Sequence, residues 1–116
     1  MAELKPCPAS PNCVSSLAGE DSAHYVKPLS WSGDIGQAKA RLRQAVLAAG
    51  NATFVVEEDM YWYIEFRSRL FRFVDDVEFL FDLASKQIHV RSASRVGHSD
   101  LGVNRKRVEK IRALFQ

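Results

Sequence analysis

The chain lacks a long apolar run and any repeated segment. Nowhere among its 116 residues do eighteen consecutive apolar residues occur, which excludes a transmembrane helix. Residues 1–6 lack the apolar segment of a secretory signal peptide, so we expect a cytoplasmic protein with no membrane span. The length and the absence of repeats predict one domain, large enough to fold without a disulfide or a metal ion.

Cysteine is scarce: only Cys7 and Cys13 are present. A zinc site would need two further ligands, and the three histidines have no metal-like spacing, so we expect no metal ion. The two cysteines would form a disulfide only in an oxidising compartment. Cys13 is also a candidate nucleophile, with His98 and Asp100 as partners, because such groups need to be close only in space.

No cofactor motif is complete. Residues 97–102 have the G-x-x-x-x-G spacing of a phosphate-binding loop between an expected strand and an expected helix. Val103 and Asn104 stand where that motif requires Lys and then Ser or Thr. The sequence therefore argues against a nucleotide-hydrolysing loop, and we expect no cofactor.

The formal net charge is only +2, but the charged residues are unevenly distributed along the chain. Residues 51–83 carry three positive and eight negative side chains, and residues 84–116 carry eight positive and two negative ones. An acidic segment next to a basic one favours mutual neutralisation in the fold over binding of nucleic acid.

Apolar periodicity predicts two helices and about four strands. The helices are expected at 34–49 and 104–115, and the strands at 53–58, 61–67, 75–83 and 88–94. Short connections predict an antiparallel meander with both helices packed on one face, an α+β fold. Residues 1–33, which contain all four prolines, are expected to form an extended arm of the same domain, and residues 34–116 its α+β core.

The expected helix ends carry recognisable capping residues. Ser32 or Asp34 is suited to cap the first helix, and Gly50 and Asn51 tolerate the left-handed conformation that often ends one. Asn104 is the expected N-cap of the last helix. The strand expected at 75–83 should direct its apolar side chains toward the core. Those side chains are Val77, Phe79, Phe81 and Leu83.

The last two strands are expected to form a hairpin closed by residues 83 and 88. In that register Asp76 opposes Arg95 on the outer face, and Glu78 lies diagonal to Arg91 and Arg95. One interpretation is a structural ladder of ion pairs, and the other is a preorganised polar site.

Polar residues are concentrated at 91–107, more than a turn requires. The ligand-binding candidates are Arg91, Ser92, Ser94, Arg95, Asp100, Asn104 and Arg105. The catalytic candidates are Asp76, Glu78 and Cys13. The hypothesis is a domain that binds, or also transforms, an anionic small molecule; the alternative is a non-catalytic interaction module with a purely structural polar cluster.

The last helix also begins with three cations, residues 105–107, near its positive dipole end. An anion is expected to compensate them, either a bound ligand or one of the internal carboxylates. Those carboxylates are Asp75, Asp76, Glu78 and Asp100. The aromatic run at 61–63 is interpreted as core, with a pocket lining as the alternative.

Three motifs carry a resemblance to a known family. PASPNCVSS at 8–16, FVDDVEF at 73–79, and RSASRVG at 91–97 with DLGVNR at 100–105 resemble domain-of-unknown-function family 1499. The resemblance spans nearly the whole chain, implies a single domain of bacterial or organellar origin, and carries no established activity or catalytic residue. It suggests that residues 12–16 pack across the sheet and reach the polar cluster.

Overall fold

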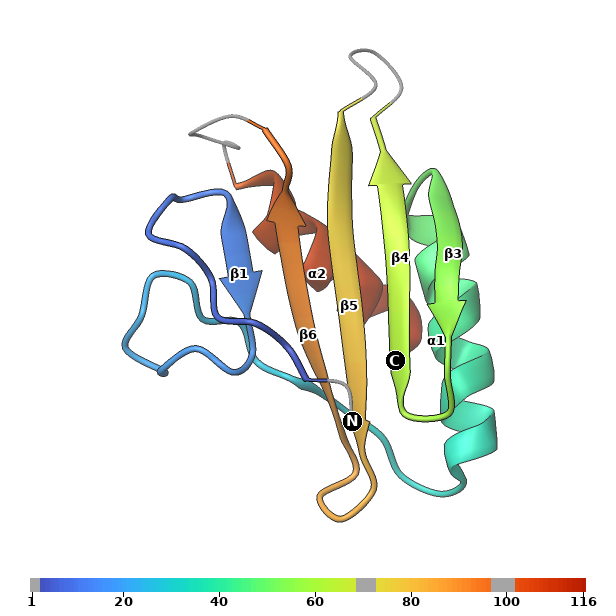
Figure 1. Ribbon diagram of the computed structural model, residues 1–116. Helices are drawn as coiled ribbons and strands as arrows, with labels where there is room; N and C mark the ends of the chain where they lie inside the picture. Colours follow the sequence, from blue (N-terminus) through green and yellow to red (C-terminus); the bar gives the residue numbers. More distant parts are fainter. Residues whose placement is uncertain (1–2, 69–72, 97–101) are drawn as a thin grey trace.

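Six antiparallel strands and two helices make up the computed structural model, which describes residues 3–68, 73–96 and 102–116 (Figure 1). The elements in chain order are β1 (Cys13–Ser15), β2 (Leu29–Ser30), α1 (Ile35–Ala49), β3 (Ala52–Glu57), β4 (Tyr61–Arg67), β5 (Val74–Asp82), β6 (Gln87–Ser94) and α2 (Val103–Phe115). Both helices cover the same face of the sheet, which confirms the α+β class.

The central strands β3 to β6 form the predicted meander, and the arm enlarges it. The strand order is β1-β6-β5-β4-β3, with β2 also paired to β6. The expectation of about four strands was short by two, because β1 and β2 come from the arm. Within β1, Cys13 pairs with Ala93 and Ser15 with Arg91, so the arm does lie beside the 91–97 motif.

Burial alternates strictly along β5. Val77, Phe79 and Phe81 are buried against the helices, as predicted. Leu83 is 55% exposed, so its predicted inward position is wrong. The strand ends at Asp82, and Leu83 begins the turn.

The β5–β6 register differs from the predicted one by two residues. Asp82 pairs with Gln87, and Glu78 directly opposes Arg91. The Asp82 carboxylate accepts a hydrogen bond from Ala84 N at 3.1 Å, which starts the turn one residue earlier than predicted. Because the shift is even, the residues that remain in β5 and β6 keep their predicted faces, whereas Leu83 leaves the strand.

Helix α1 begins and ends for reasons that its sequence only partly shows. The Asp34 carboxylate accepts from Gln37 N at 3.3 Å, as expected of an N-cap. Gly50 has φ 169°, an extended conformation, so the predicted left-handed ending is wrong. A Cβ at Gly50 would lie 3.3 Å from the Phe66 ring, so close packing explains the glycine. Neither helix of the described ranges is long and apolar enough to cross a bilayer.

Helix α2 does not use Asn104 as its N-cap, contrary to the prediction. The helix begins at Val103 after Gly102, whose φ of 78° is the left-handed conformation that glycine favours. Asn104 therefore lies inside the first turn, and its side chain is fully buried beneath the sheet.

A buried hydrogen-bond network surrounds Asn104. Its Oδ1 accepts from Ser92 Oγ at 2.6 Å, and its Nδ2 donates to Ser94 Oγ at 2.9 Å and to the Asn12 carbonyl at 3.2 Å. Arg107 donates to Asn104 Oδ1 at 2.8 Å. These bonds join the arm, β6 and α2 through groups that water does not reach.

The substitution Asn104→Ala should lower the free energy of unfolding by about 3 kcal/mol, because it leaves several buried polar groups without partners. Urea unfolding measures the loss. Asn51→Ala, at an exposed position, is the matched control and should change the free energy by less than about 0.5 kcal/mol. Equal effects of the two substitutions would contradict a structural role for the Asn104 network.

Candidate functional site

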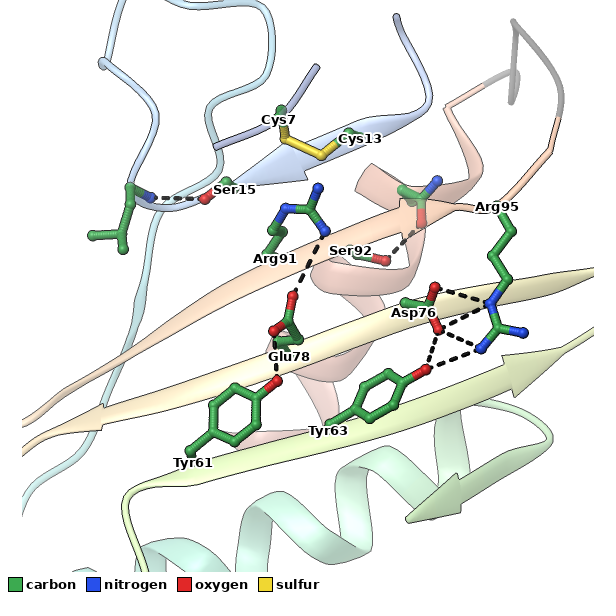
Figure 2. A network of polar contacts seen from close by, with 12 residues as sticks. Cys7, Cys13, Ser15, Tyr61, Tyr63, Asp76, Glu78, Arg91, Ser92 and Arg95 are labelled. Atoms are coloured by element: carbon green, nitrogen blue, oxygen red, sulfur yellow. Dashed lines mark hydrogen bonds and ion pairs between the residues drawn. A yellow bond between two sulfur atoms is a disulfide. The ribbon is translucent and has the colours of Figure 1, made fainter. Parts of the chain in front are cut away.

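The sheet face opposite the helices carries a cluster of polar side chains from β4, β5 and β6 (Figure 2). Their positions alternate with those of the core residues, so all of them point away from the helices. We call this set the outer cluster. Its members are Tyr61, Tyr63, Glu65, Asp76, Glu78, Arg91 and Arg95.

Arg95 organises one side of the outer cluster. Its Nε donates to Asp76 Oδ2 at 3.0 Å, and one terminal nitrogen donates to Glu65 at 2.6 Å and to the Tyr63 hydroxyl at 3.0 Å. Asp76 also accepts from the Tyr63 hydroxyl at 2.5 Å. The hydrogen bonds that Arg95 donates to Asp76, Glu65 and Tyr63 raise the pKa of Arg95. We call these four groups the closed set.

The same contacts fix the protonation of Asp76 and Tyr63. Burial alone would raise the pKa of Asp76, but the hydrogen bonds from Arg95 and Tyr63 outweigh it and lower the pKa below 3.8. Burial and the bond to Asp76 raise the pKa of Tyr63 to about 12. Neither group changes its charge near neutral pH, which makes them poorly suited to general acid–base catalysis there.

Arg91 organises the other side, with fewer partners. It faces Glu78 across the strands, and a terminal nitrogen approaches a Glu78 oxygen at 3.6 Å, too far for a hydrogen bond (Figure 2). The second Glu78 oxygen accepts from the Tyr61 hydroxyl at 2.5 Å. Burial, followed by the bond to Glu78, raises the pKa of Tyr61.

One atom of Arg91 is exceptional. Among the buried side-chain nitrogen and oxygen atoms of the described residues, only Arg91 Nε has no hydrogen-bond partner. The Arg91 side chain is only 15% exposed. Water therefore reaches this charged donor poorly, and no protein group in the described ranges replaces it.

A cavity of about 260 Å³ opens over this part of the sheet. The outer cluster supplies most of its lining, and the arm supplies Lys5. Its lining residues are Lys5, Tyr61, Tyr63, Asp76, Glu78 and Arg91. Cys7, two residues after Lys5, is joined to Cys13 of β1 by a disulfide, so the arm is tied covalently to the sheet edge (Figure 2).

The predicted site residues fall on two faces. Asp76, Glu78, Arg91 and Arg95 share the outer face. Ser92, Ser94 and Asn104 form the buried network on the helix side, so the sheet separates them from the cavity. Consecutive strand positions point in opposite directions, which is why the 91–95 segment divides in this way.

The remaining candidates have other positions. Arg105 donates to the carbonyls of Ala23 at 2.6 Å and Tyr25 at 2.7 Å, and thereby holds the arm. Cys13 is in the disulfide, so it has no thiol to act as a nucleophile in this state. Asp100 and its proposed neighbour His98 lie outside the described residues.

Four carboxylates were candidates to compensate the cations in the first turn of α2. Of these, Asp75 pairs with Arg107 of that turn. Its Oδ2 accepts from Arg107 at 2.6 Å, and both side chains are largely buried. The described parts of the chain contain no group of three or more potential ligands arranged to hold a metal ion.

Three residues of the cavity lining were not among the predicted site residues. Tyr61 and Tyr63 were interpreted as core, yet they alternate with buried Trp62 and Ile64, a signal that would have placed them on the outer face. No sequence pattern marks Lys5 as a lining residue, because its position depends on how the N-terminal arm folds over the sheet.

Acid should weaken the fold partly through Asp76. Its folded-state pKa is below the unfolded value, so the folded state binds fewer protons, and stability is lost as the pH falls through that lower pKa. Arg95→Ala should reduce this loss, because burial then raises the pKa. Melting temperatures in acidic buffers measure the slope. Lys39→Ala, which removes an ion pair on α1, should keep the wild-type slope, and an unchanged slope in Arg95→Ala would refute the assignment.

Reducing the Cys7–Cys13 disulfide should lower the free energy of unfolding by about 2 kcal/mol, because the unfolded chain regains the entropy of a short loop. Urea unfolding with and without a reductant measures this. The double substitution Cys7→Ala with Cys13→Ala is the control and should show no response to the reductant. A wild type equally insensitive to reductant would show that the bond does not stabilise the fold.

The comparison with known protein families agrees with the resemblance seen in the motifs. The chain matches the family described as protein of unknown function (DUF1499) over residues 3–115. No curated protein matches the chain. Because the family match covers nearly the whole sequence, the protein belongs to the DUF1499 family.

Proposed function

We propose that this domain binds an anionic small molecule in the cavity over the outer cluster, which we call the outer cavity. Arg91 would be the main hydrogen-bond donor to the anion, and Lys5 the second. The observation that carries the proposal is the incomplete satisfaction of the Arg91 guanidinium, which lines the cavity. Its Nε is buried without a hydrogen-bond partner, and its terminal nitrogen stands 3.6 Å from Glu78. A carboxylate or a phosphate presents two oxygens with the spacing that a guanidinium prefers.

Arg107 provides a matched comparison. Its side chain is 14% exposed, almost the same as Arg91, yet it donates to Ser92, Asn104 and Asp75. A guanidinium buried to this degree is normally hydrogen-bonded, because an unsatisfied buried donor costs about 1–3 kcal/mol or more when charged. An anion bonded to the terminal nitrogens of Arg91 would offset part of that cost, because Nε itself is buried.

Charge of neither sign is in excess around the cavity. Lys5 and Arg91 of the lining stand against Asp76 and Glu78, and Arg95 is shared between Asp76 and Glu65. The local support for an anion is therefore Arg91 itself, whose terminal nitrogen stands 3.6 Å from Glu78. The tyrosine hydroxyls donate to carboxylates, which holds both rings in fixed positions around the ligand.

Binding is favoured over catalysis by the state of the candidate catalytic groups. Asp76 is held ionised by Arg95, and Cys13 is held in a disulfide. A group that neither titrates near neutral pH nor has a free thiol offers little to a reaction. The domain is accordingly a binding domain in this proposal.

The alternative is an interaction module with a structural polar cluster. The closed set around Arg95 favours it, because every group there is satisfied internally. It leaves the unpartnered Arg91 Nε without an explanation. Binding of nucleic acid has less support, since Arg105, Arg107 and Arg112 of the basic segment donate to internal acceptors.

The disulfide bears on where the domain would act. The sequence predicted a cytoplasmic location, whereas a Cys7–Cys13 bond persists in oxidising compartments. We infer that the cavity operates with the disulfide formed, since this bond anchors the segment that carries Lys5.

Acetate, inorganic phosphate and citrate should each be tested as ligands by thermal unfolding. At a hundred times its dissociation constant, a bound anion adds about 2.7 kcal/mol to the stability of wild type. Arg91→Gln should abolish this gain, because it removes the donor. The Nε–H resonance of Arg91 should also shift in wild-type NMR spectra when the anion binds.

Arg43→Gln is the matched control for general salt effects, because Arg43 lies on α1 and pairs with Glu57 on the helix side. It should respond to anions as wild type does. Equal stabilisation of wild type and Arg91→Gln, or no stabilisation by any of the three anions, would contradict the proposal.

A further inference from the structure

A second cavity, of about 230 Å³, lies between the arm and the loop that follows β1. Apolar side chains supply much of its lining. Those side chains are Leu4, Pro6, Leu17 and Ala18. Nothing in the function proposed above uses this cavity.

The two cavities adjoin. Lys5 lines both of them. Ser15 of the second cavity also pairs directly with Arg91 of the first across β1 and β6. Side chains paired in this way stand about 4.5–5.5 Å apart at Cβ, so the two cavities lie within the length of a single small molecule.

Leu17 forms an apolar part of the rim of the second cavity, and a hydrogen bond to Ser15 fixes its backbone. Leu17 is 52% exposed, and its backbone N–H donates to Ser15 Oγ at 3.1 Å. Leu4 lies on the arm and is buried. An apolar group entering this space would cover the exposed part of Leu17 and remove that surface from water.

From this arrangement we infer that the ligand is an amphipathic anion, an inference that rests on the proposed function. Its charged head binds Arg91 and Lys5 in the outer cavity, and its apolar chain lies against Leu4, Leu17 and Ala18 in the second cavity. The Ser15 hydroxyl lies at the junction between the two parts. The ligand class is therefore a carboxylate or phosphate monoester with an alkyl or similar apolar chain.

Calorimetric titration of the intact, oxidised protein with acetate, butyrate, hexanoate and octanoate tests the inference. Affinity should rise about fourfold for each methylene that enters the apolar cavity. Hexan-1-ol, which has the chain without the charge, should bind more weakly than hexanoate. Arg91→Gln should weaken all four carboxylates.

Leu17→Ser should reduce the gain in affinity from acetate to octanoate. Leu47→Ser is the matched control, because Leu47 is 48% exposed on α1 and lines neither cavity, and it should keep the full gain. Melting temperatures of the two variants without ligand show whether each is folded.

The outcomes separate the two proposals. Binding that depends on Arg91 but has the same affinity for acetate and octanoate would overturn the amphipathic ligand and leave the anion site intact. A chain-length gain that Leu17→Ser and Leu47→Ser reduce equally would also overturn it. Hexan-1-ol binding as tightly as hexanoate and unaffected by Arg91→Gln would overturn the anion site itself, and absence of binding by every probe would overturn both.

Discussion

The pairing of β5 with β6 is the constraint on which the rest of the structure depends. Burial of Phe79 against the helices forces Glu78 to the opposite face, where it meets Arg91. The same alternation turns Ser92 inward to meet Asn104 on α2. A slip of one residue would bury the charged set and expose the apolar set, so one register determines both the buried network and the outer cluster.

The longer elements could be predicted from periodicity, and the shorter ones could not. Strand β4 runs from Tyr61 to Arg67 as expected, because seven alternating residues give a clear period of two. Strands β1 and β2 have three and two residues and exist only by pairing with the edge of β6, so no local pattern marks them. The hairpin turn carries contacts that periodicity does not mark, among them the hydrogen bond from Ala84 N to Asp82.

The candidate site was predictable only where alternation along a strand placed residues on the same face. Asp76, Glu78 and Arg91 follow the alternation and were expected on the outer face. Asn104 was taken for an N-cap because capping residues are judged by type, whereas its burial follows from the packing of α2 under the sheet. Lys5 reaches the cavity through an arm tied by a disulfide, a constraint that residue spacing left open.

Two arginines of the outer cluster differ in how fully the protein satisfies them, and the proposed anion site rests on that difference. Arg95 satisfies two carboxylates and a phenol that would otherwise repel one another or lack donors. Arg91 is more buried, yet its Nε is unsatisfied and its nearest carboxylate stands at 3.6 Å. If stability alone were at stake, an apolar side chain of similar size would serve better there. A local cost of this kind agrees with the proposed anion site, and a second cavity shares Lys5 with the Arg91 cavity.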